Sequence, residues 1–172
     1  MAKSTFSGPV RSLAGFISAG STSFVSLTAD TSLTVASHAG KVLTCNDADG
    51  KFTLPSINVN ANGASAGDND FNNLNNIGAT FTFFVETAAT DMDILTDGTD
   101  KFKGAIMIGV DDGSKKAFVP GASNDVITMN GSTKGGIVGS VVSFTAIDTA
   151  TYMVHNSLLI GSGTIVTPYA DA

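Results

Sequence analysis

The stretch that decides the fold runs from Asp125 to Thr145 and reads DVITMNGSTKGGIVGSVVSFT. Two runs of alternating apolar residues flank a glycine-rich region, and Asn130-Gly131 and Gly135-Gly136 suit turns that need a positive φ. The second run is predicted to be a strand. One of its faces would carry Val138, Val142 and Phe144, and the other would carry Ile137 and Val141. No residue in the stretch is placed to perform chemistry, so the stretch indicates β-structure and surface rather than a catalytic centre.

The composition of the whole chain favours the same fold class. The 172 residues include one glutamate, Glu86, no glutamine and no tryptophan, whereas Asp, Asn, Gly, Ser and Thr are abundant. Residues that favour helices on exposed surfaces are therefore scarce, and residues that form turns and strands dominate. A chain of this length buries roughly 68–70% of its unfolded surface as one domain. We predict an all-β, single-domain protein, either a β-sandwich or a jelly-roll-like barrel.

Strands are predicted wherever apolar residues alternate between turn signals. Residues 79–86, ATFTFFVE, give the clearest pattern, with Phe81, Phe83 and Val85 on one face. Residues 104–110, GAIMIGV, are apolar on both faces, which predicts a strand enclosed on both sides. The remaining predicted strands are 23–28, 32–35, 41–45, 51–54, 91–95, 116–119, 125–129 and 150–160.

The chain divides into a β-domain, residues 21–160, with an extended N-terminal arm, 1–20, and a C-terminal tail, 161–172. The arm has no clear period but carries spaced apolar residues, so we expect it either to lie across a neighbouring subunit or to cover its own core. Residues 56–78 interrupt the domain with a long polar loop rich in Asn, Gly, Ala and Asp. Loops of this length in compact domains are usually functional or disordered, so this one is a candidate contact loop. Its Asp70 is expected to cap one short helical turn.

Charge and cysteine content exclude several classes of protein. The net charge is −6, and the cationic residues are scattered rather than clustered, so no nucleic-acid partner is expected. Cys45 stands alone and is predicted to be a small buried apolar residue, without a disulfide. No stretch has the length of a membrane span or of a signal peptide, so we expect no membrane partner and folding in a cytoplasm.

Motifs for chemistry are weak. Residues 63–67 fit the GxSxG pattern around Ser65, but polar loop sequence surrounds them instead of a strand and a helix. His38 and His155 are isolated and are expected to make local hydrogen bonds. Four pairs of aspartates could suggest calcium but lack the ordered loop that ends in a bidentate glutamate, so calcium binding stays open: Asp47 and Asp49, Asp68 and Asp70, Asp91 and Asp93, Asp97 and Asp100. We predict no catalytic, cofactor-binding or metal-binding residue and no enzymatic activity.

Four segments in a fixed order resemble a family of small virion structural proteins from tailed phages, especially marine podoviruses. They are AKSTFSGPVRS near the start, LTADTSLTVASHAGKVLTCNDADGKFTLP, ITMNGSTKGGIVGSVVSF, and LLIGSGTIVTPYADA at the end. They are distributed from residue 2 to residue 172, so that the resemblance extends over most of the chain, although each motif alone carries little information. Two departures stand out: residues 56–78 look like an insertion, and Tyr152 occupies a position where Trp is common.

The resemblance implies a capsid decoration or cement protein on the exterior of the virion, made in the host cytoplasm and present in many copies. The partners it implies are the major capsid protein and further copies of the chain, and a trimer would match local threefold positions of an icosahedral shell. The candidate contact residues lie in the arm and the tail: Phe6, Pro9, Phe16, Ile17, Pro168 and Tyr169. The alternative is a phage fibre, tail or receptor-binding β-module, for which residues 56–78 would be the contact loop. A β-hydrolase that uses Ser65 is the third hypothesis.

Overall fold

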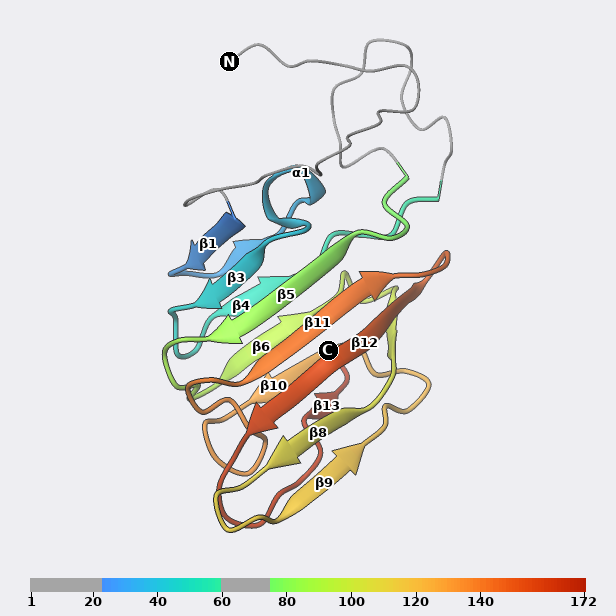
Figure 1. Cartoon of the computed structure of the whole chain (residues 1–172). Coiled ribbons are helices and arrows are strands. Elements are labelled where there is room, and N and C mark those ends of the chain that lie inside the picture. Colours follow the sequence, from blue (N-terminus) through green and yellow to red (C-terminus); the bar gives the residue numbers. More distant parts are fainter. Residues whose placement is uncertain (1–22, 60–74) are drawn as a thin grey trace, which may run out of the picture.

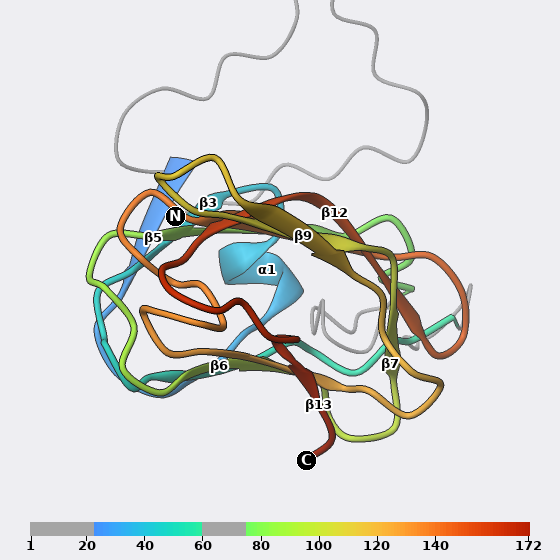
Figure 2. The same ribbon diagram turned by 90° about the horizontal axis from the view of Figure 1, so that it is seen from below.

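The computed structural model describes residues 23–59 and 75–172, which are almost entirely β and form two sheets (Figure 1). The larger sheet has eight strands, and seven of them follow the order β1-β3-β5-β11-β12-β8-β9, while β7 also pairs with β12. Their bounds are β1 Phe24–Leu27, β3 Val42–Cys45, β5 Thr80–Val85, β7 Lys101–Lys103, β8 Ile106–Gly109, β9 Lys115–Phe118, β11 Val141–Ala146 and β12 Thr151–Ile160. The smaller sheet has the order β13-β10-β6-β4-β2. Its strands are β2 Thr31–Ser32, β4 Lys51–Thr53, β6 Met92–Leu95, β10 Val126–Met129 and β13 Tyr169–Ala170. Figure 2 shows the two sheets as two layers.

The first six strands alternate between the two sheets, so that the chain winds as a three-turn coil. In the larger sheet β1, β3 and β5 are parallel neighbours, and in the smaller sheet β2, β4 and β6 are parallel neighbours. Phe24 and its partner Val42 are 18 residues apart, whereas Val42 and its partner Thr82 are 40 apart. The second turn is 22 residues longer than the first, close to the 23 residues of 56–78, so this loop accounts for the difference.

Apolar side chains fill the space between the layers. The prediction for the strand around Phe83 is confirmed, because Phe81, Phe83 and Val85 are at most 2% exposed. Phe83 of the larger sheet stacks on Phe52 of the smaller sheet at a centroid distance of 6.2 Å. Phe83 also meets Phe144 edge to face at 5.7 Å. Such aromatic contacts contribute about 0.5–1.5 kcal/mol each beyond the burial of their area.

The glycine-rich region between β10 and β11 forms the predicted turns. Gly131, Gly135 and Gly136 all have positive φ, and a Cβ on Gly131 would lie 2.2 Å from the backbone oxygen of Ala89. The strand after this region begins at Val141, however, and not at residue 137. Its buried face carries Val142 and Phe144 as predicted, but Val138 lies before the strand and is 50% exposed, so its predicted place on that face is wrong.

Two further predictions need correction, and two strands were missed. Residues 104–110 do not form a strand enclosed on both sides, because Met107 of β8 is 44% exposed while Ile106 and Ile108 are fully buried. The predicted strand 32–35 is wrong beyond Ser32, where β2 ends, since residues 35–38 form a one-turn helix, α1 (Val35–His38), capped by the hydroxyl of Thr34. Strands β7 and β13 were not predicted. Both strands are short and show no strand pattern in their own residues. Their hydrogen bonds to strands distant in the sequence stabilise them.

Candidate interaction surface

The side of the larger sheet that faces away from the smaller sheet carries a row of apolar side chains. The strand register places one residue from each of five adjacent strands in this row, and we call them the apolar row: Phe84, Val141, Leu158, Met107 and Ala117. Leu158 is 48% exposed, Met107 44% and Phe84 37%. On the other side of the same strands, residues such as Phe83, Val142 and Leu159 lie in the core. We call this outward side the outer face.

Two further rows on the outer face contain polar groups that are bonded to one another. The hydroxyl groups of Thr82 and Ser143 lie 3.0 Å apart across β5 and β11. Those of Thr80 and Thr145 lie 2.7 Å apart, and Thr145 also bonds Nε2 of His155 at 2.8 Å. Because these groups already have partners within the sheet, covering them removes few hydrogen bonds to water.

A bulge in β12 places Leu158 in the apolar row. Val141 pairs with Leu158 but Ser143 pairs with His155, so β12 has one residue more than β11 between these two pairs. Within this bulge Asn156 has φ 45°, and among the described residues it is the only non-glycine residue with positive φ. The extra residue switches the side-chain alternation, so that Leu158 points outward and Leu159 inward. The strand prediction over 150–160 missed this bulge, although an Asn inside an apolar run signals one.

No Lys, Arg, Asp or Glu occupies the apolar row or the row that contains Thr82 and Ser143. Charged side chains lie around these rows instead: Glu86 follows β5, Lys115 begins β9, and the exposed Lys103 of β7 pairs with Met153 of β12 on the outward side. Glu86 belongs to the outer face because its carboxylate accepts a 2.9 Å bond from the amide of Asn46, which also donates to Ser26 on this face. Lys115 shares the outward side of β9 with Ala117 by alternation. The protein has a net charge of −6, so these two uncharged rows are a marked exception on its surface.

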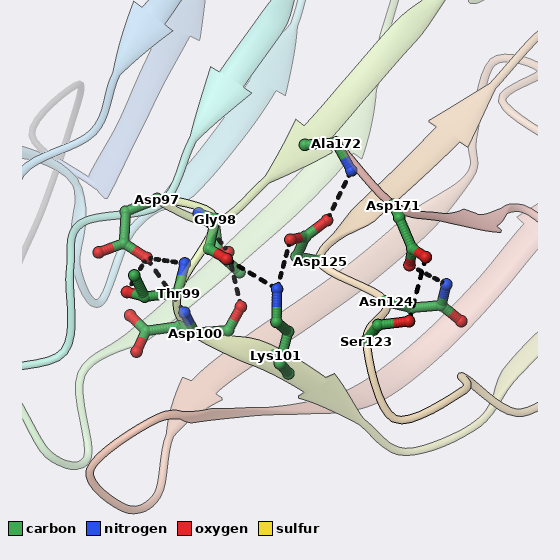
Figure 3. Close-up of polar contacts among 11 residues, drawn as sticks. Asp97, Gly98, Thr99, Asp100, Lys101, Ser123, Asn124, Asp125, Asp171 and Ala172 are labelled. Atoms are coloured by element: carbon green, nitrogen blue, oxygen red, sulfur yellow. Dashed lines mark hydrogen bonds and ion pairs between the residues drawn. The ribbon is translucent and has the colours of Figure 1, made fainter.

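The last residues of the chain are bonded to the body of the protein (Figure 3). Nζ of Lys101 lies 2.6 Å from a carboxylate oxygen of Asp125 and donates to the carbonyl of Gly98 at 2.7 Å. The other carboxylate oxygen of Asp125 accepts the backbone N–H of Ala172 at 2.9 Å. Asp171 accepts hydrogen bonds from Ser123 and Asn124. These contacts hold β13 against β10.

The hydrogen bonds of this region set the acidity of two carboxyl groups. Burial opposes the ionisation of Asp125, but the Lys101 ammonium and the Ala172 amide outweigh it and lower the pKa of Asp125. Burial also acts against ionised Asp97, while hydrogen bonds from Ser56 and Thr99 outweigh it and lower the pKa of Asp97 to about 2. Both groups are therefore ionised at neutral pH and stabilise the structure in that form.

Of the six predicted contact residues, the structure places two. Pro168 is buried, and Tyr169 is only 7% exposed and donates its hydroxyl hydrogen to the carbonyl of Gly104 at 2.9 Å. Both side chains therefore serve the chain's own fold, so burial argues against the contact role predicted for them. The other four, Phe6, Pro9, Phe16 and Ile17, lie outside the described residues.

The base of the predicted contact loop 56–78 is tied together by Asn76, which is 3% exposed. Its side chain donates to the carbonyl of Ser56 and accepts the N–H of Asn58, both at 2.8 Å. Its backbone N–H donates to the carbonyl of Asn58 at 2.9 Å. The two ends of the loop are thus held next to each other. The helical turn predicted after Asp70 and the GxSxG motif around Ser65 lie outside the described residues.

The other residues considered from the sequence have local roles. Cys45 is a free, fully buried thiol, as predicted, and burial raises its pKa to about 12. Nδ1 of His38 accepts the N–H of Thr34 at 2.9 Å, and burial lowers the pKa of His38. His155 bonds Thr145, so both histidines make the local hydrogen bonds predicted for them. Within 23–59 and 75–172, no three His, Cys, Asp or Glu side chains gather as a metal site would require.

One hollow on the surface lies beside β7. It has a volume of about 450 Å³ and lies between the segments 101–105 and 119–122. Phe102, Val119 and Pro120 give it a largely apolar lining, and Val119 is 75% exposed. The hollow is a second place where an apolar group of another molecule would fit.

Comparisons with protein-family models, with curated proteins and with solved structures found no match for this chain. Among the described residues, no helix has the length and apolar character needed to cross a membrane. The outer face is therefore the main structural guide to function.

Proposed function

We propose that this chain is a virion structural protein of a tailed phage, a decoration or cement protein that binds the exterior of the capsid in many copies. The observation that carries the proposal is the outer face, whose apolar row and Thr82–Ser143 row hold no charged side chain on an otherwise acidic protein, as expected of a component that assembles with further copies. Surfaces of this kind are typical of protein–protein contact. The four segments that resemble phage virion proteins supply the assembly in which such contacts would be made.

The architecture suits a role in a shell. We assign the two layers to a β-sandwich rather than to a closed barrel, because the larger sheet ends at β1 and β9 and the smaller at β13 and β2. The bonded tail adds rigidity, since Asp125 holds both Lys101 and the backbone of Ala172. A rigid body loses little conformational entropy when it binds. The role proposed is thus mechanical rather than enzymatic.

Stabilisation of the shell would come from many weak contacts acting together. Each copy would bind the major capsid protein weakly, and linked copies would bind with an avidity far above the affinity of one contact. We place the capsid contact on the N-terminal arm, at Phe6, Pro9, Phe16 and Ile17, as the sequence predicts. Pro168 and Tyr169 are left out of this contact because they are buried in the fold.

The test is co-sedimentation of the purified protein with shells of its source phage that lack it, with the bound copies counted. We expect saturation at on the order of hundreds of copies per shell. A variant in which Phe6, Phe16 and Ile17 are all replaced by serine should lose this binding but keep the thermal melting temperature of the wild type. Binding of about a dozen copies at the vertices would instead support the fibre or tail alternative, and no binding would refute a role on the shell.

A further inference from the structure

We propose that two copies of this chain pair through their outer faces, about a twofold axis that runs along β12. This inference does not rest on the proposed function, because it concerns the purified protein alone. A twofold pair also differs from the trimer that the resemblance suggested. Three properties of the outer face lead to it: the symmetry of its apolar row, the placement of its rim charges and the internal pairing of its hydroxyl groups.

The apolar row is arranged symmetrically around Leu158. Val141 and Met107 lie on the strands on either side of β12, and Phe84 and Ala117 lie one strand further out. A twofold axis along β12 therefore places Leu158 against its own copy and Val141 against Met107. It also places the large side chain of Phe84 against the small one of Ala117. Large residues facing small ones allow two surfaces to interlock.

The same axis brings opposite charges together at the rim. Glu86 lies two residues beyond Phe84, and Lys115 lies two residues from Ala117 on the antiparallel strand β9, so both extend from the same end of the row. β5 and β9 are equally far from β12 in the sheet order. Glu86 of one copy therefore meets Lys115 of the other, and the contact occurs twice. Within one copy the two residues are four strand spacings apart, roughly 19 Å, which is too far for a direct bond.

Pairing would remove few hydrogen bonds to water. The polar groups near the middle of the outer face, Thr82 with Ser143 and Thr145 with His155, are already bonded within the sheet. Burial of polar groups is costly mainly when they lose partners. Two faces of this kind are expected to pack about 10 Å apart, as sheets do in β-sandwiches.

A second copy explains this face better than a partner of opposite charge. Each copy carries a net charge of −6, so two copies repel each other unless their contact surface is neutral. The two uncharged rows of the outer face meet that requirement, and Glu86 of one copy is complementary to Lys115 of the other under the twofold axis. A basic partner would match the acidic remainder of the surface instead.

The first experiment measures the mass of the full-length protein by sedimentation velocity over a series of concentrations. We expect the wild type to reach twice the chain mass of 17.4 kDa. Leu158→Glu, which sets two carboxylates against each other on the axis, should weaken pairing by about 100-fold or more. Val166→Glu is the matched control, because Val166 is 43% exposed and lies outside the outer face, and it should pair as the wild type does.

The second experiment exchanges the rim charges. Glu86→Lys and Lys115→Glu each place like charges across the axis and should weaken pairing by about tenfold. The double variant Glu86→Lys/Lys115→Glu should restore it. Because the two residues are far apart within one copy, such a rescue reports a contact between copies. Circular dichroism of every variant checks that the fold is intact.

Several results would overturn the proposal. A wild type that stays monomeric at every concentration would do so, as would a dimer that Leu158→Glu leaves unchanged. Failure of the double charge variant to recover would disprove the twofold axis along β12. A chain that pairs only after residues 1–22 are removed would assign the outer face to the chain's own N-terminal segment.

Discussion

Replacing Tyr169 with alanine separates two roles for the C-terminal tail, namely contact with another protein and completion of the chain's own fold. Tyr169 is 7% exposed, lies in β13 opposite Ile127 of β10, and donates its hydroxyl hydrogen to the carbonyl of Gly104. An aromatic side chain buries roughly 150 Å² or more. At about 25 cal/mol per Å², and after subtracting the methyl group that alanine keeps, the loss is about 3 kcal/mol. Measured losses for comparable truncations of aromatic residues are about 3–5 kcal/mol.

The assay is urea unfolding followed by circular dichroism at one fixed protein concentration, because pairing of copies would otherwise shift the midpoint. For a chain of this size, a loss of about 3 kcal/mol corresponds to a fall in melting temperature of roughly 6–12 °C. Tyr169→Phe serves as the matched control and should lose only about 1 kcal/mol, since it keeps the ring and removes one hydrogen bond. Tyr169→Ala with a stability within about 0.5 kcal/mol of the wild type and impaired shell binding would refute this reasoning and return the tail to a contact role.

Three further predictions concern backbone geometry and charge. At Asn156, where φ is 45°, glycine should be tolerated while valine should cost about 1–2 kcal/mol in urea unfolding; equal stability of the two would show that the bulge relaxes. Gly136→Ala should cost about 2 kcal/mol or more, because a Cβ there would lie 2.7 Å from Cβ of Met129 at φ 94°. Gly163→Ala, with positive φ but no atom within 4 Å, should cost only about 1 kcal/mol, and a reversed order would contradict the packing argument. The lowered pKa of Asp125 means that its contribution is present above pH 4 and lost as the pH falls below that value, so Asp125→Asn should be about 1.5 kcal/mol less stable than the wild type at pH 7. Melting curves at decreasing pH should show this difference shrinking towards pH 2, and a constant difference would refute the assignment.

The sequence predicted the parts of the fold that local patterns determine. Alternation around Phe83 identified the buried face of β5, and Asn130-Gly131 identified a turn with positive φ. The coiled order of the first six strands was not predictable in this way. Partners such as Val42 and Thr82 are far apart in the chain, and a strand's own residues do not specify which distant strand it pairs with.

The outer face shows the same limit. Alternation assigns Met107 and Phe84 to the side opposite the core, but it does not reveal whether another layer covers that side. The apolar character of residues 104–110 therefore suggested a strand enclosed on both sides, whereas Met107 is open to solvent. Residue types alone also did not reveal the place of the tail in the fold: Tyr169 lies in a strand of the smaller sheet, while the contact role predicted for it stays a prediction.

The three-turn coil has a consequence for the order in which the protein folds. Within β1 to β6, each strand of a sheet pairs with the preceding strand of that sheet. The pairing partner of each new strand is therefore synthesised before the strand itself. The first closure, Phe24 with Val42, joins residues 18 apart, while the second, Val42 with Thr82, joins residues 40 apart. That difference raises the entropic cost of the second closure by roughly 0.7 kcal/mol. Closing the base of the loop through Asn76 first would shorten the effective loop, which makes this asparagine a candidate for an early step in folding.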